Sequence, residues 1–478
     1  MPGVARIDDR ALARRVAQEF NPGEVVGLGS GLPTLIPGEL PAAPGVLFLA
    51  DSGALGYCLP GAAPGSGTAA PLQGSGPVDS GGRVVALLAG GAVLSLVDAA
   101  AMVRGGRVDA AVLQPAQVTA GGDFTHWTTG ATPGLFSPAS AVDLASGAGR
   151  VIAMMPHTGV DGNPSIVDRS SLPLDGIGCV GTIITDVAVI RVTQDGLVLA
   201  EVAPGWTMEA VAAITGAPLS ASAGLREMSF DVPRLEPPNK VYTAQDAVRD
   251  VPDGAVVNID GFAGPGGMAH YLLVALRDQG AKNLTMISNT AGIARVVNFG
   301  TPPGRLAIDH SILVDNKQVK KAIASYPVSP RASQPSSFEL AFQRGEVELE
   351  VVPQGTLAER LRAGGAGVAA FYTPTGAGTL LAEGKETRII DGKEYVLETG
   401  LTADFCLIRG HKADTLGNVV FKGTSRNFNP VMAAASRVTI VEVDEIVESG
   451  ALSPEEIVTP GIYVGRIVKR PAGFSPYE

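Results

Sequence analysis

Two glycine-rich segments mark places where the backbone of this chain could approach a ligand closely. The first, residues 27–33, follows an apolar run and reads Gly-Leu-Gly-Ser-Gly-Leu-Pro. A dinucleotide fingerprint would need its third glycine at Leu32, so we exclude a nicotinamide cofactor. Ser30 lacks the flanking glycines of a nucleophile elbow, because residue 28 is Leu28. Taken alone, this segment is best interpreted as a turn between a strand and a helix.

The second segment, residues 260–267, reads Asp-Gly-Phe-Ala-Gly-Pro-Gly-Gly. Such a loop lets backbone N–H groups reach a ligand and stabilise an oxyanion. A plain turn explains the same residues equally well.

The histidines do not indicate a metal site. None of the five has a partner at a metal-ligand spacing, and the chain contains no Cys-x-x-Cys. We therefore expect ordinary surface or core histidines, and no spacing selects a Ser-His-Asp triad. They are His126, His157, His270, His310 and His411.

One further segment, residues 354–367, predicts a helix with a glycine-rich end. Glu359 and Arg362 are three residues apart and would lie together on its exposed face.

The elements that must position these segments recur weakly in the two halves of the chain. Four stretches of the first half have counterparts in the same order in the second half. They are 11–28 with 245–259, 104–109 with 344–348, 185–191 with 403–409, and 199–202 with 440–443.

Each half alternates helical stretches with short Val/Ile-rich runs, which predicts an α/β fold with mostly parallel sheets. A proline-rich seam at residues 233–238 separates two domains, 1–230 and 240–478. We expect two similar domains that form a pseudo-dimer, with the active site at their junction.

Composition excludes several classes of protein. The 478 residues are 45% hydrophobic and 17% charged, which is typical of globular chains. The net charge is −11 without a basic block, so we expect no nucleic-acid partner. The longest apolar runs are too short to cross a bilayer, no signal-peptide pattern is present, and three cysteines suggest a reducing compartment. We expect a soluble, cytoplasmic protein with no membrane partner.

Motifs along nearly the whole chain resemble family I coenzyme A (CoA) transferases of the 3-oxoacid, or succinyl-CoA:3-ketoacid, type. At 288–292, 353–360, 370–376 and 426–429 above all, the second half resembles the α subunit. At 29–33, 53–56, 104–106, 108–109 and 183–185, the first half resembles the β subunit. The resemblance implies a β-subunit-like domain fused before an α-subunit-like domain, the reverse of the common order.

The resemblance also implies a nucleophile. In this family a glutamate within Glu-Asn-Gly attacks the acyl-CoA thioester and then carries CoA as a glutamyl thioester. The aligned triplet here is Asp51-Ser52-Gly53. Asp51 keeps the carboxylate but is one methylene shorter, and a misplacement of ~1 Å can cost ~10²-fold in rate. Asp-Ser-Gly is also an ordinary turn sequence.

Other site residues are implied in the same way. Asn289 and Gln354 would act with Asp51 by orienting the acyl oxygens. The residues expected to contact CoA are Gly261, Phe262, Ala263, Gly264, Gly266, Gly267, Gln114, Gln117 and Gly376. The resemblance implies no metal and no tightly bound cofactor, an acyl-CoA and a carboxylic acid as small-molecule partners, and a homo-oligomer.

The first half departs from the family at 114–116 and 138–144, so two further hypotheses stay open. The protein could be an acyl-CoA hydrolase that cleaves a thioester or a C–C bond, with Asp51 as general base. It could also be a CoA-binding protein without activity. A requirement for an acceptor acid in CoA release separates these from a transferase.

Overall fold

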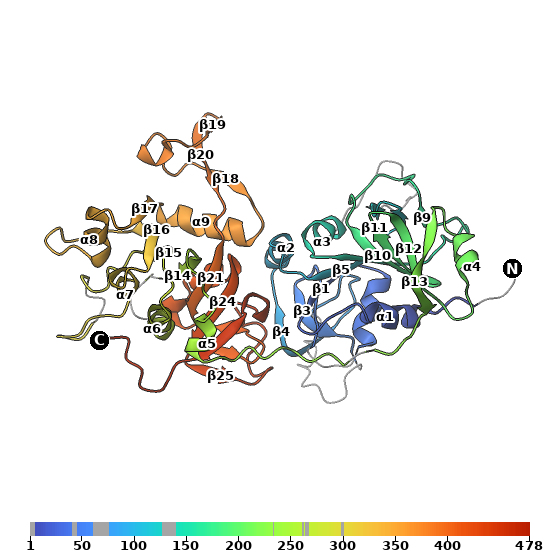
Figure 1. Cartoon of the computed structure of the whole chain (residues 1–478), viewed down its shortest axis with the longest axis horizontal. Coiled ribbons are helices and arrows are strands. Elements are labelled where there is room, and N and C mark those ends of the chain that lie inside the picture. The colour runs from blue at the N-terminus through green and yellow to red at the C-terminus, as the bar shows by residue number, and fades with distance from the viewer. Residues whose placement is uncertain are drawn as a thin grey trace. The chain divides into compact units, whose positions relative to one another are not determined.

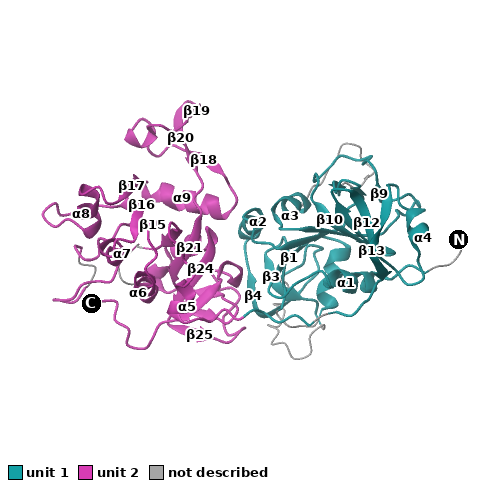
Figure 2. Cartoon of the chain, viewed as in Figure 1, with its two compact units in different colours: residues 1–238 teal, residues 239–478 magenta. Residues whose placement is uncertain are grey.

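The computed structural model describes residues 5–40, 45–60, 76–126, 140–232, 234–260, 262, 267–297 and 301–478. The chain divides into two compact units, residues 1–238 and 239–478 (Figure 2). Each contains one large sheet with helices, so the predicted α/β class is confirmed (Figure 1). The expected pairing of the two units around one site stays a prediction.

Unit 1 is built on a mixed ten-stranded sheet. Its central strands are parallel to one another, and antiparallel strands extend both sides. In spatial order the strands are β13 (Leu219–Glu227), β12 (Gly196–Val202), β11 (Ala188–Thr193), β10 (Val180–Thr185), β8 (Val151–Met155), β5 (Ala110–Leu113), β1 (Val25–Leu28), β2 (Leu47–Leu49), β3 (Ala54–Cys58) and β4 (Ala86–Val93).

The helices of unit 1 are short, and three of them have a capping side chain at their start. For example, the Asp8 carboxylate accepts the Ala11 N–H at 2.8 Å at the start of α1, as an N-cap residue should. The remaining elements are α1 (Asp9–Ala17), η1 (Leu32–Gly38), α2 (Leu96–Arg104), α3 (Ala141–Gly147), α4 (Met208–Ala212) and a small sheet of β7 (Phe124–Thr125), β6 (Gln117–Thr119) and β9 (Ile166–Val167).

Unit 2 is built on a seven-stranded sheet in which every neighbouring pair is parallel. Its strands, in spatial order, are β17 (Glu348–Val351), β16 (Val319–Tyr326), β15 (Leu284–Thr290), β14 (Val256–Ile259), β21 (Ala403–Arg409), β24 (Ser436–Val443) and β26 (Arg466–Lys469). Its helices are α5 (Ala244–Val248), α6 (His270–Gln279), α7 (Ser311–Asp315), α8 (Ser337–Gln343), α9 (Gln354–Gly365), α10 (Asn429–Ala434), η3 (Leu380–Ala382), η4 (Gly423–Arg426) and η5 (Gly461–Tyr463).

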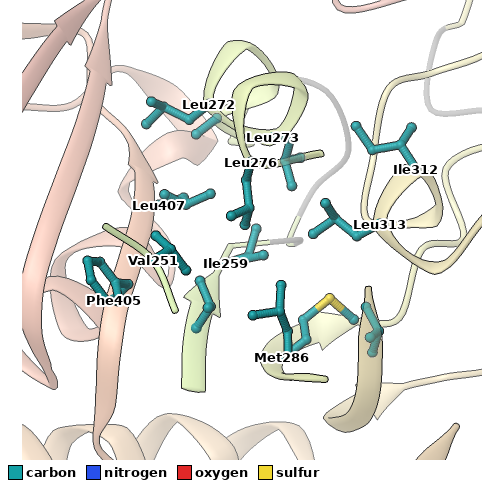
Figure 3. Packing of buried hydrophobic residues seen from close by; sticks show 14 of the residues in the cluster. Val251, Ile259, Leu272, Leu273, Leu276, Met286, Ile312, Leu313, Phe405 and Leu407 are labelled. Atoms are coloured by element: carbon teal, nitrogen blue, oxygen red, sulfur yellow. The ribbon is translucent and has the colours of Figure 1, made fainter. Parts of the chain in front are cut away.

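Helices cover both faces of this parallel sheet. Phe405 and Leu407 of β21 pack into a core that includes α5 to α8, whereas Cys406 and Ile408 pack against α9 and α10. In Figure 3, Leu276 of α6 points toward β14. Two small sheets complete the unit: β18 (Ala370–Thr373), β20 (Lys393–Thr399) and β19 (Thr387–Ile390), and β23 (Val419–Val420), β22 (Lys412–Asp414) and β25 (Glu445–Val447).

The central strands of the two sheets begin in the same way. The Val25 N–H of β1 donates to the Asp109 carboxylate at 2.8 Å, and the Val256 N–H of β14 donates to the Asp404 carboxylate at 3.0 Å. Each aspartate lies at the start of the parallel strand next to the central one. The structure therefore makes β5 the counterpart of β21.

This correspondence corrects the internal repeat expected from the sequence. The first pair of stretches is confirmed, because 11–28 and 245–259 both form a helix followed by a central strand. The other three pairs are wrong, since their strands occupy different places in the two sheets. For example, β11 is antiparallel to its neighbours, whereas β21 is parallel to both of its own.

Candidate active site

Asp51 lies in a tight turn between β2 and β3. The Gly53 N–H donates to the Ala50 carbonyl at 3.0 Å, and the Ala50 N–H donates to the Ala54 carbonyl at 2.9 Å. Gly53 has φ +97°, and a Cβ there would lie 2.0 Å from the Leu94 carbonyl oxygen. Only glycine fits both conditions. The segment is thus the turn its composition indicates, and this turn holds Asp51 at the carboxyl end of β2.

Two serines connect Asp51 to neighbouring segments. The Ser140 hydroxyl, just before α3, donates to Asp51 Oδ2 at 3.0 Å. The Asp51 N–H donates to Ser80 Oγ at 3.3 Å, and the Ser80 hydroxyl donates to the Leu28 carbonyl at 2.6 Å. The half-buried Asp51 is therefore positioned by backbone and side-chain contacts from three places in the chain.

A pocket of about 280 Å³ opens beside the Asp51 carboxylate. Its walls come from the end of β2, one face of α2 and the start of α3. The pocket lies at the carboxyl edge of the parallel strands of unit 1, the edge at which open α/β sheets bind ligands.

The two glutamines of unit 1 that were predicted to contact CoA are engaged within the protein. Gln114 Oε1 accepts the Leu32 N–H at 2.7 Å, and a Cβ on Gly31 would lie 2.2 Å from that oxygen. Gln114 therefore holds the first glycine loop. Gln117 Oε1 accepts the Ser171 N–H at 3.1 Å and anchors a different loop. Their contacts to CoA stay a prediction.

In unit 2 the structure brings the two predicted amides together. Asn289 lies near the end of β15 and is buried, and Gln354 begins α9. Gln354 Nε2 donates to Asn289 Oδ1 at 3.1 Å. A helix start and a strand end thus place two neutral hydrogen-bonding groups at the carboxyl edge of this sheet.

The second glycine loop is described only in part. Gly261, Ala263, Gly264 and Gly266 lie outside the described residues. The Phe262 N–H donates to Asp260 Oδ1 at 2.8 Å, and the carbonyl of the buried Gly267 accepts from Asn429 Nδ2 at 3.1 Å. Gly376 follows β18 in the separate three-stranded sheet, so it belongs to another part of unit 2.

The core interpretation of the histidines is confirmed for His157. Its ring nitrogens each lie 2.9 Å from a threonine hydroxyl, Thr185 and Thr215, and burial lowers its pKa to about 4. His310 is fully buried, with Nε2 at 3.1 Å from Ser288 Oγ. Among the described residues, no cluster of His, Cys, Asp or Glu could hold a metal ion.

Sequence reasoning missed Glu442 at the end of β24. This side chain is fully buried and accepts the Tyr271 and Leu272 N–H groups at 2.9 and 3.2 Å. It thereby satisfies free N–H groups at the start of α6, the helix that follows the second glycine loop. Burial raises the pKa of Glu442 to about 7, although the nearby Arg409 opposes this shift.

The raised pKa of Glu442 predicts a pH-dependent stability. Between the ordinary carboxyl pKa of 4.5 and about 7, the folded state keeps a proton that the unfolded chain has released. The stabilisation is therefore complete below that range and is lost as pH rises through it. We expect Glu442→Gln to flatten the fall in the urea midpoint of unfolding between about pH 5 and 7.5. The exposed Glu448→Gln is the control, and a slope unchanged in Glu442→Gln would contradict the prediction.

The geometry defines an α/β protein with a positioned carboxylate beside a pocket. A sequence model of a family described as Coenzyme A transferase matches residues 10–213 and 241–470. One of the subunits of a probable succinyl-CoA:3-ketoacid coenzyme A transferase from Bacillus subtilis is 46% identical over 226 residues, which are 47% of this chain and 87% of that protein. The corresponding polypeptide of a 3-oxoadipate CoA-transferase from Pseudomonas putida is 46% identical over 231 residues, 48% of this chain and 93% of that protein.

A solved structure of an acyl-CoA transferase from Escherichia coli O157:H7 is 24% identical, with a TM-score of 0.41, and the match covers 49% of this chain and 48% of that chain. The family model extends over both units, and the chain belongs to the coenzyme A transferase family. The resemblance found in the sequence is confirmed, and the protein is an enzyme that transfers CoA. No helix in the described ranges is long and apolar enough to cross a membrane.

Proposed function

We propose that this enzyme moves CoA from an acyl-CoA to a carboxylic acid of the 3-oxoacid type, with Asp51 as the nucleophile. The observation that carries the proposal is the placement of Asp51 on a glycine-dependent turn, beside a pocket and hydrogen-bonded to Ser140. A nucleophile needs this kind of fixed position, since small misplacements cost large factors in rate.

The proposed reaction conserves all atoms without water. The Asp51 carboxylate attacks the thioester carbonyl, the C–S bond breaks, and an acyl-aspartyl anhydride and CoA thiolate form. The thiolate attacks the aspartyl carbonyl, releases the donor carboxylate and leaves an aspartyl-CoA thioester. The acceptor carboxylate reverses these steps, takes CoA and frees Asp51.

The Asn289 and Gln354 amides have a supporting role in this proposal. They orient the oxygens of the acyl group or the acceptor as charge develops on them. Neutral amides suit this task because they donate hydrogen bonds without changing protonation state. Their mutual hydrogen bond at 3.1 Å keeps both side chains in a defined position before substrate arrives.

The organisation of the chain is proposed on the same basis. Units 1 and 2 would correspond to the β and α subunits of two-chain relatives, fused in the order β then α. The buried free thiols of Cys58 and Cys406 are consistent with a reducing, cytoplasmic environment. We also propose a homo-oligomer, which size-exclusion chromatography with light scattering would measure.

The test of the proposed function is the acceptor dependence of CoA release. A transferase incubated with acyl-CoA alone should release only about one molecule of the donor acid per active site, because CoA then stays bound to the enzyme. Sustained turnover should start when an acceptor carboxylic acid is added. Sustained release of free CoA without an acceptor would instead show a hydrolase and overturn the proposal.

A further inference from the structure

The pocket beside Asp51 has a predominantly apolar wall. Leu96, Ala99, Ala100 and Val103 of α2 line it, and their spacing of 3, 4 and 7 residues places them on one helix face. Leu144 of α3 closes part of the remaining wall. A wall of this kind favours an aliphatic group, because its surface leaves water on binding.

The charged groups of the lining are both carboxylates. Asp51 is the proposed nucleophile, and Asp143 on α3 is the second acid. No cation is among the described residues that line the pocket. Arg104, which closes α2, lies outside the lining and has a guanidinium nitrogen 3.8 Å from Asp143 Oδ1. A ligand with its own terminal carboxylate would therefore meet like charge and no positive partner inside the pocket.

The size of the pocket limits what it can hold. A volume of about 280 Å³ is at the lower end for small-molecule sites. It offers room for a short chain of methylene groups and not for the much larger CoA moiety. Since Asp51 lines the pocket together with these apolar residues, an acyl chain within it would have its carbonyl carbon near the proposed nucleophile.

We infer that this pocket binds the tail of a short, uncharged aliphatic acyl group, and that Asp143 disfavours dicarboxylic acyl groups. The inference rests on the proposed function of Asp51. The acyl specificity inferred for this chain therefore differs from the succinyl and 3-oxoadipate groups in the names of its relatives.

The test compares acyl-CoA donors with the full-length enzyme and acetoacetate as acceptor, a 3-oxoacid that differs from the acid released by every donor. We expect kcat/KM to rise from acetyl-CoA to butyryl-CoA by about fourfold per methylene buried. The kcat/KM for butyryl-CoA should exceed that for succinyl-CoA, which has the same number of acyl carbons, by at least about tenfold. Equal or better use of succinyl-CoA would overturn the inference and leave the proposed function standing. Absence of acceptor-dependent transfer with every donor would overturn both.

Two variants test the assigned walls directly. Ala100→Leu fills the pocket, so it should lower kcat/KM for hexanoyl-CoA by about tenfold more than for acetyl-CoA. Asp143→Asn should reduce the ratio of kcat/KM for butyryl-CoA to kcat/KM for succinyl-CoA. The control is Val97→Ala, because Val97 is 69% exposed on the same helix and does not line the pocket. The assignment of these walls to acyl-group binding would be refuted if both pocket variants kept the chain-length and charge preferences of the wild type.

Discussion

The Asp51→Asn variant should lose CoA transfer by about 10⁴-fold or more, as expected when a covalent nucleophile is removed. The amide has nearly the same shape and can still accept the Ser140 hydrogen bond, but it does not attack a thioester. Steady-state release of the new acyl-CoA measures the loss. Asp98→Asn on α2 is the matched control, since its carboxylate is held by Ser95 at 2.7 Å and lies outside the pocket lining.

Mass spectrometry of the intact protein separates a nucleophile from a general base. Wild-type enzyme incubated with acyl-CoA and no acceptor should gain the mass of CoA less one water, and the asparagine variant should not. Asp51→Glu restores the family's side chain and should retain or raise transfer. Full activity in Asp51→Asn would show that another group carries the chemistry.

The second large effect is expected at Gln354. Replacing it with alanine removes one amide donor and releases the amide of Asn289, so kcat should fall by about 10²–10³-fold. The KM for acyl-CoA should change much less, because the proposed contact of Gln354 is with the acyl oxygens and not with the CoA moiety. Steady-state kinetics with varied acyl-CoA measures both constants.

The control for Gln354→Ala is Gln279→Ala at the end of α6. That amide donates to the Val251 carbonyl at 2.9 Å and has no proposed contact with substrate. Equal melting temperatures for the two variants, with turnover lost only at Gln354, would support a role in catalysis. A rise in KM at unchanged kcat would assign Gln354 to binding alone.

Local elements of this protein were predictable because their residues act over short distances. The runs 25–28 and 256–259 are mostly apolar and rich in β-branched residues, and both form central parallel strands over those residues. The helix expected within 354–367 begins at Gln354 and ends at Gly365. The turn around Asp51 follows from Asp-Ser-Gly itself.

Contacts between distant segments were not predictable in the same way. Ser140 and Ser80 meet Asp51 across 89 and 29 residues, and nothing in a lone serine indicates such a partner. Asp109 and Asp404 are equivalent because each accepts a hydrogen bond from the central strand beside it. Which strands become neighbours does not follow from local sequence similarity. A buried glutamate such as Glu442 is also contrary to the usual preference of that residue for the surface.

The turn at Gly53 makes the backbone position of residue 51 independent of the length of its side chain. The backbone there is determined by a glycine conformation and by the nearby Leu94 carbonyl, not by the side chain at position 51. Aspartate and glutamate differ by one third-position base in their codons. The reach of the proposed nucleophile could therefore change in a single evolutionary step while the fold around it stayed the same.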